Sequence, residues 1–318
     1  MLSTDWSRAI GIEVPIVNAP MGGAAGGALA AAVSRAGGLG MIGMGSSATA
    51  AKLEAELPHV ANLNRPFGIG LVEWVAADQP ELLDTALAAH PALLSVSFGE
   101  RWDWVRRAHH AGVLAATQVP DLASAERAVA AGVDVVIARG AEGGGHGQPL
   151  IGTLPLLTDL LDHLTVPVLA AGGISSGRGL AAVLAAGAAA AWVGTAFTAC
   201  TESLLSDKTR EQLIAATGGD TVTTRAFDVA LGYAWPPSLP ERVLRNEFSD
   251  HWDGDEDALD RAAADTLAAA ITAEDFTTAP INAGQGVGAL TAVCSAADVI
   301  SQLTGDAADL LSRWTTRD

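Results

Sequence analysis

The segment Gly140–His146 has the sequence Gly-Ala-Glu-Gly-Gly-Gly-His, in which a histidine, a side chain that can transfer protons, follows a glycine-rich run. It follows the apolar run Val133–Ala138, which predicts a buried parallel strand. His146 therefore follows the carboxyl end of a strand, where α/β sheets and barrels place catalytic groups. Because histidine is the side-chain type best suited to proton transfer near neutral pH, we interpret His146 as a general acid or base. A surface histidine on a mobile loop is the alternative.

Two further glycine-bearing turns predict an anion site. The run Val166–Ala171 leads into Gly172 and Gly173, and the run Ala191–Phe197 contains Gly194 and Thr195. In a barrel these would be the turns after strands seven and eight, where backbone N–H groups bind phosphate, and a Cβ atom would block that approach. With the histidine on the preceding loop, the pattern indicates flavin mononucleotide (FMN). Tight turns that bind no ligand are the alternative.

A third glycine cluster, residues 22–27, follows the first predicted strand. Its spacing is not Gly-x-Gly-x-x-Gly, and no acidic residue ends a second strand at the expected place, so a Rossmann dinucleotide site is disfavoured. The preceding Ala19, Pro20 and Met21 are interpreted as a backbone shelf, on which the Met21 sulfur could pack against an aromatic ring.

Short apolar runs alternate with alanine-rich helical stretches along the first two thirds of the chain. Several helical stretches end in Ala-Gly before the next strand, the usual left-handed helix stop. Eight such units predict an α/β fold of the (β/α)8 barrel type, with a doubly wound open sheet as the alternative. The predicted strands are Pro15–Ala19, Gly40–Gly43, Phe67–Val72, Leu93–Phe98, Val113–Val119, Val133–Ala138, Val166–Ala171 and Ala191–Phe197.

The pattern changes after the eighth strand. Residues 1–205 are predicted to form the FMN-binding barrel, and residues 206–283 show no strand rhythm, so they predict a mostly helical subdomain over the barrel mouth. Residues 284–318 contain the amphipathic run Val287–Leu303, which predicts a helix returning to the barrel. Tyr233 and Trp235 fall in the middle segment and are hypothesised to shape the substrate pocket.

Composition limits the class of protein. The net charge of −18 argues against a nucleic-acid partner, since nothing here could neutralise a phosphate backbone. Two cysteines without metal-type spacing predict neither a disulfide framework nor a metal site. The first residues lack a signal-peptide pattern, and no uninterrupted apolar run could span a membrane, so we expect a cytoplasmic protein without a membrane partner.

Taken with these features, several segments resemble the nitronate monooxygenase family, once called 2-nitropropane dioxygenases. The similarity extends over nearly the whole chain and is most specific in the histidine loop and in the long segment after it. The matching segments are Ala19-Pro20-Met21-Gly22, Ala31–Gly43, Gly140–Gly147, Gly152–Leu157 and Pro167–Ser203.

The resemblance implies an FMN-dependent (β/α)8 enzyme that oxidises nitronates or nitroalkanes with O2 to carbonyl compounds and nitrite. His146 would be the base that removes the proton α to the nitro group. An NAD(P)H-dependent FMN reductase of the same fold, acting on quinones or enoyl thioesters, is the alternative, and a homodimer is left open. The implied cofactor residues are Ala19, Pro20, Met21, Gln118, Gly144, Gly145, Gly172, Gly173, Gly194 and Thr195.

Arg139 departs from the pattern of the family, in which glutamine is usual at this position. A cation beside the flavin would stabilise the reduced anionic ring. Arg139 could equally pair with Glu142 or reach solvent, and the sequence does not choose among these three interpretations.

Overall fold

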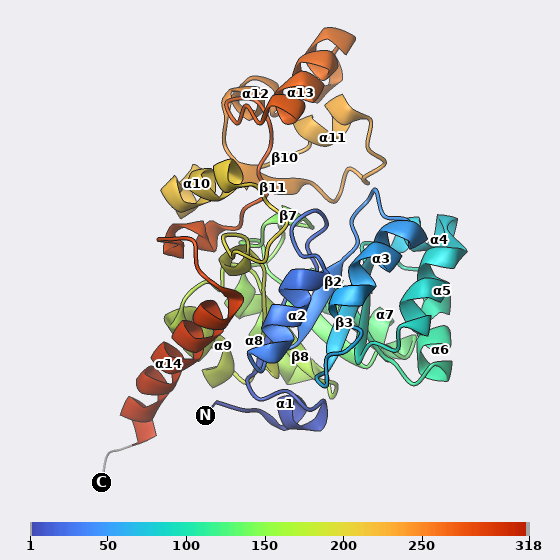
Figure 1. The fold of residues 1–318 in the computed structure, drawn as a ribbon, viewed down its shortest axis with the longest axis vertical. Coiled ribbons are helices and arrows are strands. Elements are labelled where there is room, and N and C mark those ends of the chain that lie inside the picture. The colour runs from blue at the N-terminus through green and yellow to red at the C-terminus, as the bar shows by residue number, and fades with distance from the viewer. Residues whose placement is uncertain (1, 316–318) are drawn as a thin grey trace.

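The computed structural model describes residues 2–315, and its centre is the predicted (β/α)8 barrel (Figure 1). Residue 1 and residues 316–318, at the ends of the first and third predicted units, lie outside the described residues. All neighbouring strands are parallel, in the order β1-β9-β8-β6-β5-β4-β3-β2. The strands are β1 (Ile16–Asn18), β2 (Gly40–Gly43), β3 (Phe67–Val72), β4 (Leu93–Ser97), β5 (Leu114–Val119), β6 (Val135–Arg139), β8 (Val168–Ala171) and β9 (Ala190–Val193).

The barrel closes between β1 and β2. Val17 forms a parallel bridge with Leu39, and the amide of Leu39 donates to the carbonyl of Ile16 at 2.9 Å. The buried Asn18 side chain reinforces this seam, because its amide donates to the Met41 carbonyl at 3.0 Å and its oxygen accepts from the Met41 amide at 2.7 Å. A buried polar side chain is tolerated here because its hydrogen-bonding groups are satisfied.

The alternation of side chains along the strands divides the core into a barrel interior and an outer layer. The barrel interior contains Met41, Ile137, Leu169 and Trp192, and Trp6 from the N-terminal segment packs against the same cluster. Strand residues of the other parity pack against the surrounding helices. The covering helices are α2 (Gly27–Arg35), α3 (Ala50–Glu56), α4 (Glu73–Asp78), α5 (Pro80–Ala88), α6 (Asp103–His110), α7 (Leu122–Ala130), α8 (Thr153–His163) and α9 (Gly177–Ala185).

The predicted helix stops are confirmed. Gly37, Gly112, Gly132 and Gly187 each follow a helix and have positive φ, between 71° and 106°. Glycine is the residue that enters this region without a steric penalty, so the chain can turn directly into the next strand. The predicted cap of α9 is also present, since Ser176 Oγ accepts from the Gly179 amide at 3.2 Å.

The segment after the barrel contains helices, and it also contains strands that the sequence analysis did not predict. Strands β10 (Thr221–Thr224) and β11 (Glu241–Leu244) form an antiparallel sheet with β7 (Gly145–His146), which is the histidine loop itself. These strands are short and polar, so they carry no apolar alternation. The helices of the outer subdomain, as we call residues 206–283, are α10 (Asp207–Ala215), α11 (Ala226–Leu231), α12 (Glu247–Trp252) and α13 (Arg261–Ala273).

The final helix, α14 (Ala296–Thr315), packs against α9 and α2 and completes the outer layer of the barrel. It begins later than the predicted start at Val287, because residues Gln285–Ala289 form a short 3-10 helix instead. In Figure 1 the outer subdomain lies at one end of the barrel, and α1 (Asp5–Ala9) lies at the other. Among the residues that the structure describes, no helix is long and apolar enough to cross a membrane.

Candidate functional site

A cavity of about 670 Å³ lies where the carboxyl ends of the barrel strands meet the outer subdomain. This volume is within the range of small-molecule and cofactor sites. Tyr233 and Trp235, which were hypothesised to shape a pocket, both line it. So do His146 and all the predicted cofactor residues, namely Ala19, Pro20, Met21, Gln118, Gly144, Gly145, Gly172, Gly173, Gly194 and Thr195.

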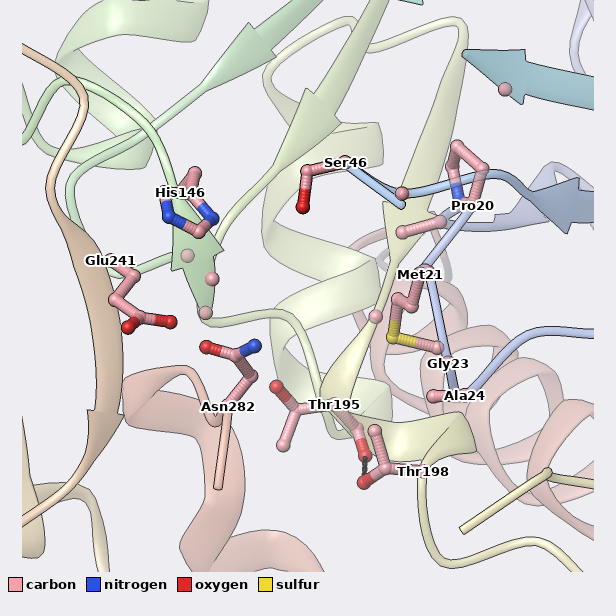
Figure 2. Close-up of a pocket in the computed structure, with 18 of the residues that line it drawn as sticks. Pro20, Met21, Gly23, Ala24, Ser46, His146, Thr195, Thr198, Glu241 and Asn282 are labelled. Carbon is pink, nitrogen blue, oxygen red and sulfur yellow. Dashed lines mark hydrogen bonds between the residues drawn. The ribbon is translucent and has the colours of Figure 1, made fainter. Parts of the chain in front are cut away.

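The predicted shelf forms one wall of the cavity, as Figure 2 shows for Pro20 and Met21. It packs against two barrel strands at glycines. A Cβ atom on Gly43 would clash with the backbone of Pro20 and Met21, and one on Gly70 would clash with the Pro20 ring. The two glycines therefore let the chain after β1 fold across β2 and β3, which places the shelf at the barrel mouth.

The turns after β8 and β9 form a glycine cradle, by which we mean Gly172, Gly173, Gly194 and Thr195. Gly172 has φ +116° and Gly173 has φ +67°, in the left-handed region that favours glycine. In the described chain, the N–H groups of Gly173 and Gly194 donate to no protein acceptor. A Cβ atom on Gly172 would lie 2.6 Å from Thr153 Oγ1, so the cradle requires glycine for packing as well as for conformation.

Thr195 lies at the start of a 3-10 helix, Thr195–Phe197. The predicted strand Ala191–Phe197 is therefore too long, because β9 ends at Val193 and the chain turns at Gly194. The Thr195 hydroxyl accepts from the Gly284 amide at 2.9 Å and keeps its own hydrogen available to donate. This bond also ties the cradle to the segment that leads back to the barrel.

His146 is held by the outer subdomain as well as by its own loop. Its backbone is paired with Glu241 of β11, and its Nε2 lies 2.9 Å from Asp228 Oδ2 on α11. Both side chains are largely buried, with 13% and 8% of their surfaces exposed. Because a carboxylate can only accept, Nε2 carries the hydrogen and Nδ1 keeps a lone pair. Nδ1 has no hydrogen-bond partner among the described residues, so it is available as a base.

An aromatic cluster fixes the plane of the imidazole. Trp235 stacks on His146 with ring centroids 3.6 Å apart and planes 8° apart. Trp235 in turn makes edge contacts with Trp74 at 5.6 Å and with Phe98 at 5.1 Å. Phe98 has φ +72°, a strained conformation for a residue with a bulky side chain. Such strain is typical of positions that a binding site requires.

The structure rejects two of the three interpretations of Arg139. It is buried, and its Nη2 donates to the carbonyls of Gly143, Gly144 and Gly145 at 3.0–3.3 Å. The interpretation that it reaches solvent is wrong, and within the described chain it forms no ion pair with Glu142. Arg139 instead holds the histidine loop from inside, and it also lines the cavity. Burial lowers the pKa of Arg139 to about 10, with Arg242 adding to the shift, so the guanidinium stays charged at neutral pH.

Glu142 anchors the other side of the histidine loop. Its carboxylate accepts from the amide and the hydroxyl of Thr153 at 2.9 and 2.8 Å. Thr153 is the first residue of α8, where a carboxylate satisfies free N–H groups and complements the helix dipole. The loop is thus held at both ends, and the alternative of a surface histidine is wrong, because only 13% of the His146 side chain is exposed.

Glu241 and Asn282 also line the cavity. Figure 2 shows both side chains on the side of His146, across the cavity from Pro20 and Met21. Only 5% of the Glu241 surface is exposed. Burial, followed by the charge of Asp228, raises the pKa of Glu241 to about 8.

His146, Asp228 and Glu241 offer ligand atoms that lie within 4.8 Å of one another. The sequence analysis predicted no metal site and could not foresee this grouping. It also missed the roles of Asp228 and Glu241, which lie in a segment read only as polar and helical. The one local signal was an apolar helical stretch, Ala226–Leu231, with a single acidic residue in it.

The fold and this site define a class: a barrel enzyme with a glycine cradle and a histidine paired with a carboxylate at the same mouth. Comparison with known proteins agrees. The nitronate monooxygenase family model matches residues 4–90 and 72–306. The chain belongs to the nitronate monooxygenase family, and it is an oxidoreductase.

Individual relatives differ in the reactions that their names record. A nitronate monooxygenase of Pseudomonas aeruginosa is 35% identical over 288 residues, covering 75% of this chain and 80% of the relative. A (3aS,4S,5R,7aS)-5-hydroxy-7a-methyl-1-oxo-octahydro-1H-indene-4-carboxyl-CoA dehydrogenase of Rhodococcus jostii is 33% identical over 248 residues, covering 78% and 67%. The structure of FabK from Thermotoga maritima has a TM-score of 0.87 and 28% identity, covering 99% of both chains.

Proposed function

We propose that this protein is an FMN-dependent oxidoreductase that oxidises nitronates, and nitroalkanes after deprotonation, with O2. The observation that carries the proposal is the position of His146. A buried imidazole with a free Nδ1 and a carboxylate on Nε2 faces the same cavity as a cradle of unpaired N–H groups. The family match and the P. aeruginosa relative favour nitronates as the substrate class.

The residues present fit FMN. Gly172, Gly173, Gly194 and Thr195 would hold its phosphate, because the cradle presents the N–H groups of Gly173 and Gly194 and the Thr195 hydroxyl as donors. Pro20 and Met21 would flank its ring, and Gln118 would meet a polar edge. When bound, FMN supplies the two-electron oxidation and the reaction with O2.

The side chains supply the proton chemistry. His146 Nδ1 takes the proton from the carbon next to the nitro group, and Asp228 stabilises the imidazolium that results. Trp235 keeps the ring in one plane, and Arg139 keeps the loop in one conformation. A nitronate has already lost this proton, so it needs the orientation of the site but not its base.

The test is the visible spectrum of the purified protein, followed by anaerobic titration. We expect a yellow protein whose bound flavin bleaches on addition of propionate 3-nitronate. A protein that stays colourless after mixing with FMN would contradict the proposal, as would a flavin that bleaches rapidly with NADH or NADPH but not with the nitronate.

A second candidate is oxidoreduction of an acyl thioester at the carbon next to the carbonyl. The R. jostii relative favours it, since its name records a carboxyl-CoA substrate. The carbon acid chemistry is similar, because a base next to the flavin site can remove that proton too. A short saturated acyl-CoA that bleaches the flavin anaerobically, with no response to the nitronate, would select this candidate.

A further inference from the structure

We propose that Glu241 is a neutral hydrogen-bond donor that binds the substrate oxygen on which negative charge collects as His146 removes the proton. The inference rests on the proposed function and extends it to a second catalytic residue. The group that it recognises is an oxygen on the atom that is bonded to the acidic carbon. Nitroalkanes, nitronates and acyl thioesters share this chemistry.

The first step of the argument is position. Glu241 begins β11, and its backbone lies directly opposite His146 in the antiparallel ladder. Side chains at paired positions project from the same face of a sheet, so both reach the same cavity. A carboxyl oxygen of Glu241 lies within 4.8 Å of the ligand atoms of His146 and Asp228. One substrate molecule can therefore meet the base and Glu241 together.

The second step is the lack of a protein partner. Glu241 is 95% buried, yet its carboxyl group makes no hydrogen bond or ion pair with any described residue, and it lines the cavity. The neighbouring Asn282 amide is also without a side-chain partner in the described chain. A buried polar group without a partner is costly unless a ligand satisfies it.

The third step concerns charge. The titratable groups that face Glu241 are Asp228 on α11 and His146 on β7. Strand β10 and residues 279–283, which also pack against β11, carry no titratable side chain. Arg242 is on the opposite face of β11, where it donates to the Ala141 carbonyl and the Thr221 hydroxyl. Burial, followed by the charge of the Asp228 carboxylate, favours the neutral form of Glu241 and raises its pKa to about 8.

The fourth step is the chemistry. The proton leaves carbon for His146 Nδ1, and the C–H electron pair becomes the new C=N bond, or C=C bond in a thioester. The displaced π pair moves to oxygen, which accepts the hydrogen bond from the Glu241 O–H group. Nothing is oxidised or reduced in this step. A carboxyl group kept neutral by its surroundings is a known donor to such an oxyanion.

The experiment uses the flavin-loaded protein and two variants. Glu241→Gln keeps a donor of the same size that cannot ionise, and Glu241→Leu removes the donor. Glu247→Gln is the matched control, because Glu247 is an exposed carboxylate of the outer subdomain outside the cavity. Activity is measured against pH with nitroethane and with a short acyl-CoA, which separates the two substrate sources.

We expect kcat/KM of the unsubstituted protein and of the control to fall above about pH 8, where Glu241 ionises. Glu241→Gln should not show this decrease at high pH, the alkaline limb of the profile. Glu241→Leu should have a kcat/KM that is roughly 100-fold lower at every pH. Binding of propionate, an unreactive analogue of ethylnitronate, is followed through the flavin spectrum. Its Kd should rise at least 10-fold in Glu241→Leu but stay nearly unchanged in Glu241→Gln.

An unaltered alkaline limb in Glu241→Gln, or unaltered propionate binding in Glu241→Leu, would overturn the inference. A divalent cation that copurifies with the protein and is lost in Glu241→Gln would also overturn it, because a metal ligand must be ionised. If the protein binds no flavin, or its flavin ignores nitronate and acyl-CoA alike, the proposed function itself fails.

Discussion

The two sides of the cavity are built in opposite ways. The glycine cradle comes from two neighbouring strand ends, and it works through backbone N–H groups. The polar wall, which we define as His146, Asp228, Trp235 and Glu241, comes from the histidine loop and three parts of the outer subdomain. It works through side chains, and the position of His146 among them depends on Asp228 and Trp235.

This difference predicts which function of the site is lost when only one of the two sides is altered. The glycine cradle is altered when side-chain atoms are added to its residues, but not when distant residues change their chemistry. The polar wall tolerates changes in the cradle but loses its proton-transfer geometry when the contact of His146 with Asp228 or with Trp235 is removed. Substitutions on one side should therefore spare the function of the other, and the following four tests examine that separation.

The largest effect is expected for His146→Ala. Turnover of a neutral nitroalkane should fall about 1,000-fold, because no group remains to take the proton, while turnover of the preformed nitronate falls much less. Flavin binding should be unchanged, since the cradle is intact. Steady-state kinetics with both substrate forms measure this, and equal loss on both would mean that His146 orients the substrate instead.

Asp228→Asn should reduce nitroalkane turnover about 100-fold. An amide can donate to the imidazole as well as accept, so the tautomer with a free Nδ1 is no longer enforced. The pH dependence of kcat/KM should change together with its magnitude. A variant with normal kinetics would show that the 2.9 Å contact is only structural.

Gly172→Ala tests the other side. The new Cβ would lie 2.6 Å from Thr153 Oγ1, and φ +116° strains any L side chain, so we expect FMN affinity to fall roughly 30-fold. Once saturated with FMN, the variant should keep the ratio of nitroalkane to nitronate turnover. Fluorescence titration with FMN gives the affinity, and Gly219→Ala, at a glycine with open surroundings, is the control.

The smallest effect, counted per pH unit, concerns stability. The folded protein raises the pKa of Glu241 from 4.5 to about 8, so it holds a proton that the unfolded chain releases between these values. The free energy of unfolding should therefore fall as pH rises through this window, with a contribution of roughly 1 kcal/mol per pH unit from this group. Urea unfolding at several pH values should show this slope reduced in Glu241→Gln and retained in Glu247→Gln.

Much of the barrel was predictable because its signals are local. Each predicted strand of the barrel overlaps an observed one, and the errors are at strand ends. In the outer subdomain the error is larger, because two whole strands, β10 and β11, were not predicted. Thr221–Thr224 and Glu241–Leu244 carry polar residues on both faces, and their strand conformation depends on pairing with each other and with β7.

The site divides in the same way. Glycines after apolar strands reveal the cradle, since the requirement for a bare backbone is visible in residue type alone, and every predicted cofactor residue lines the cavity. The burial of Arg139 inside the histidine loop could not be foreseen. Its side chain had several partners within reach, and only the folded loop, with Gly147 leaving room for the guanidinium, selects the carbonyls.

The amino-acid sequence alone determined the alternation of eight strands with helices, the glycine turns and the histidine at a strand end. Each of these depends on residues that lie close together along the chain. The tertiary structure alone decided that Asp228, 82 positions away, meets His146, and that Glu241 is paired opposite it. No local pattern encodes such contacts. They exist because closing the barrel brings the outer subdomain over its mouth, where burial raises the pKa of Glu241.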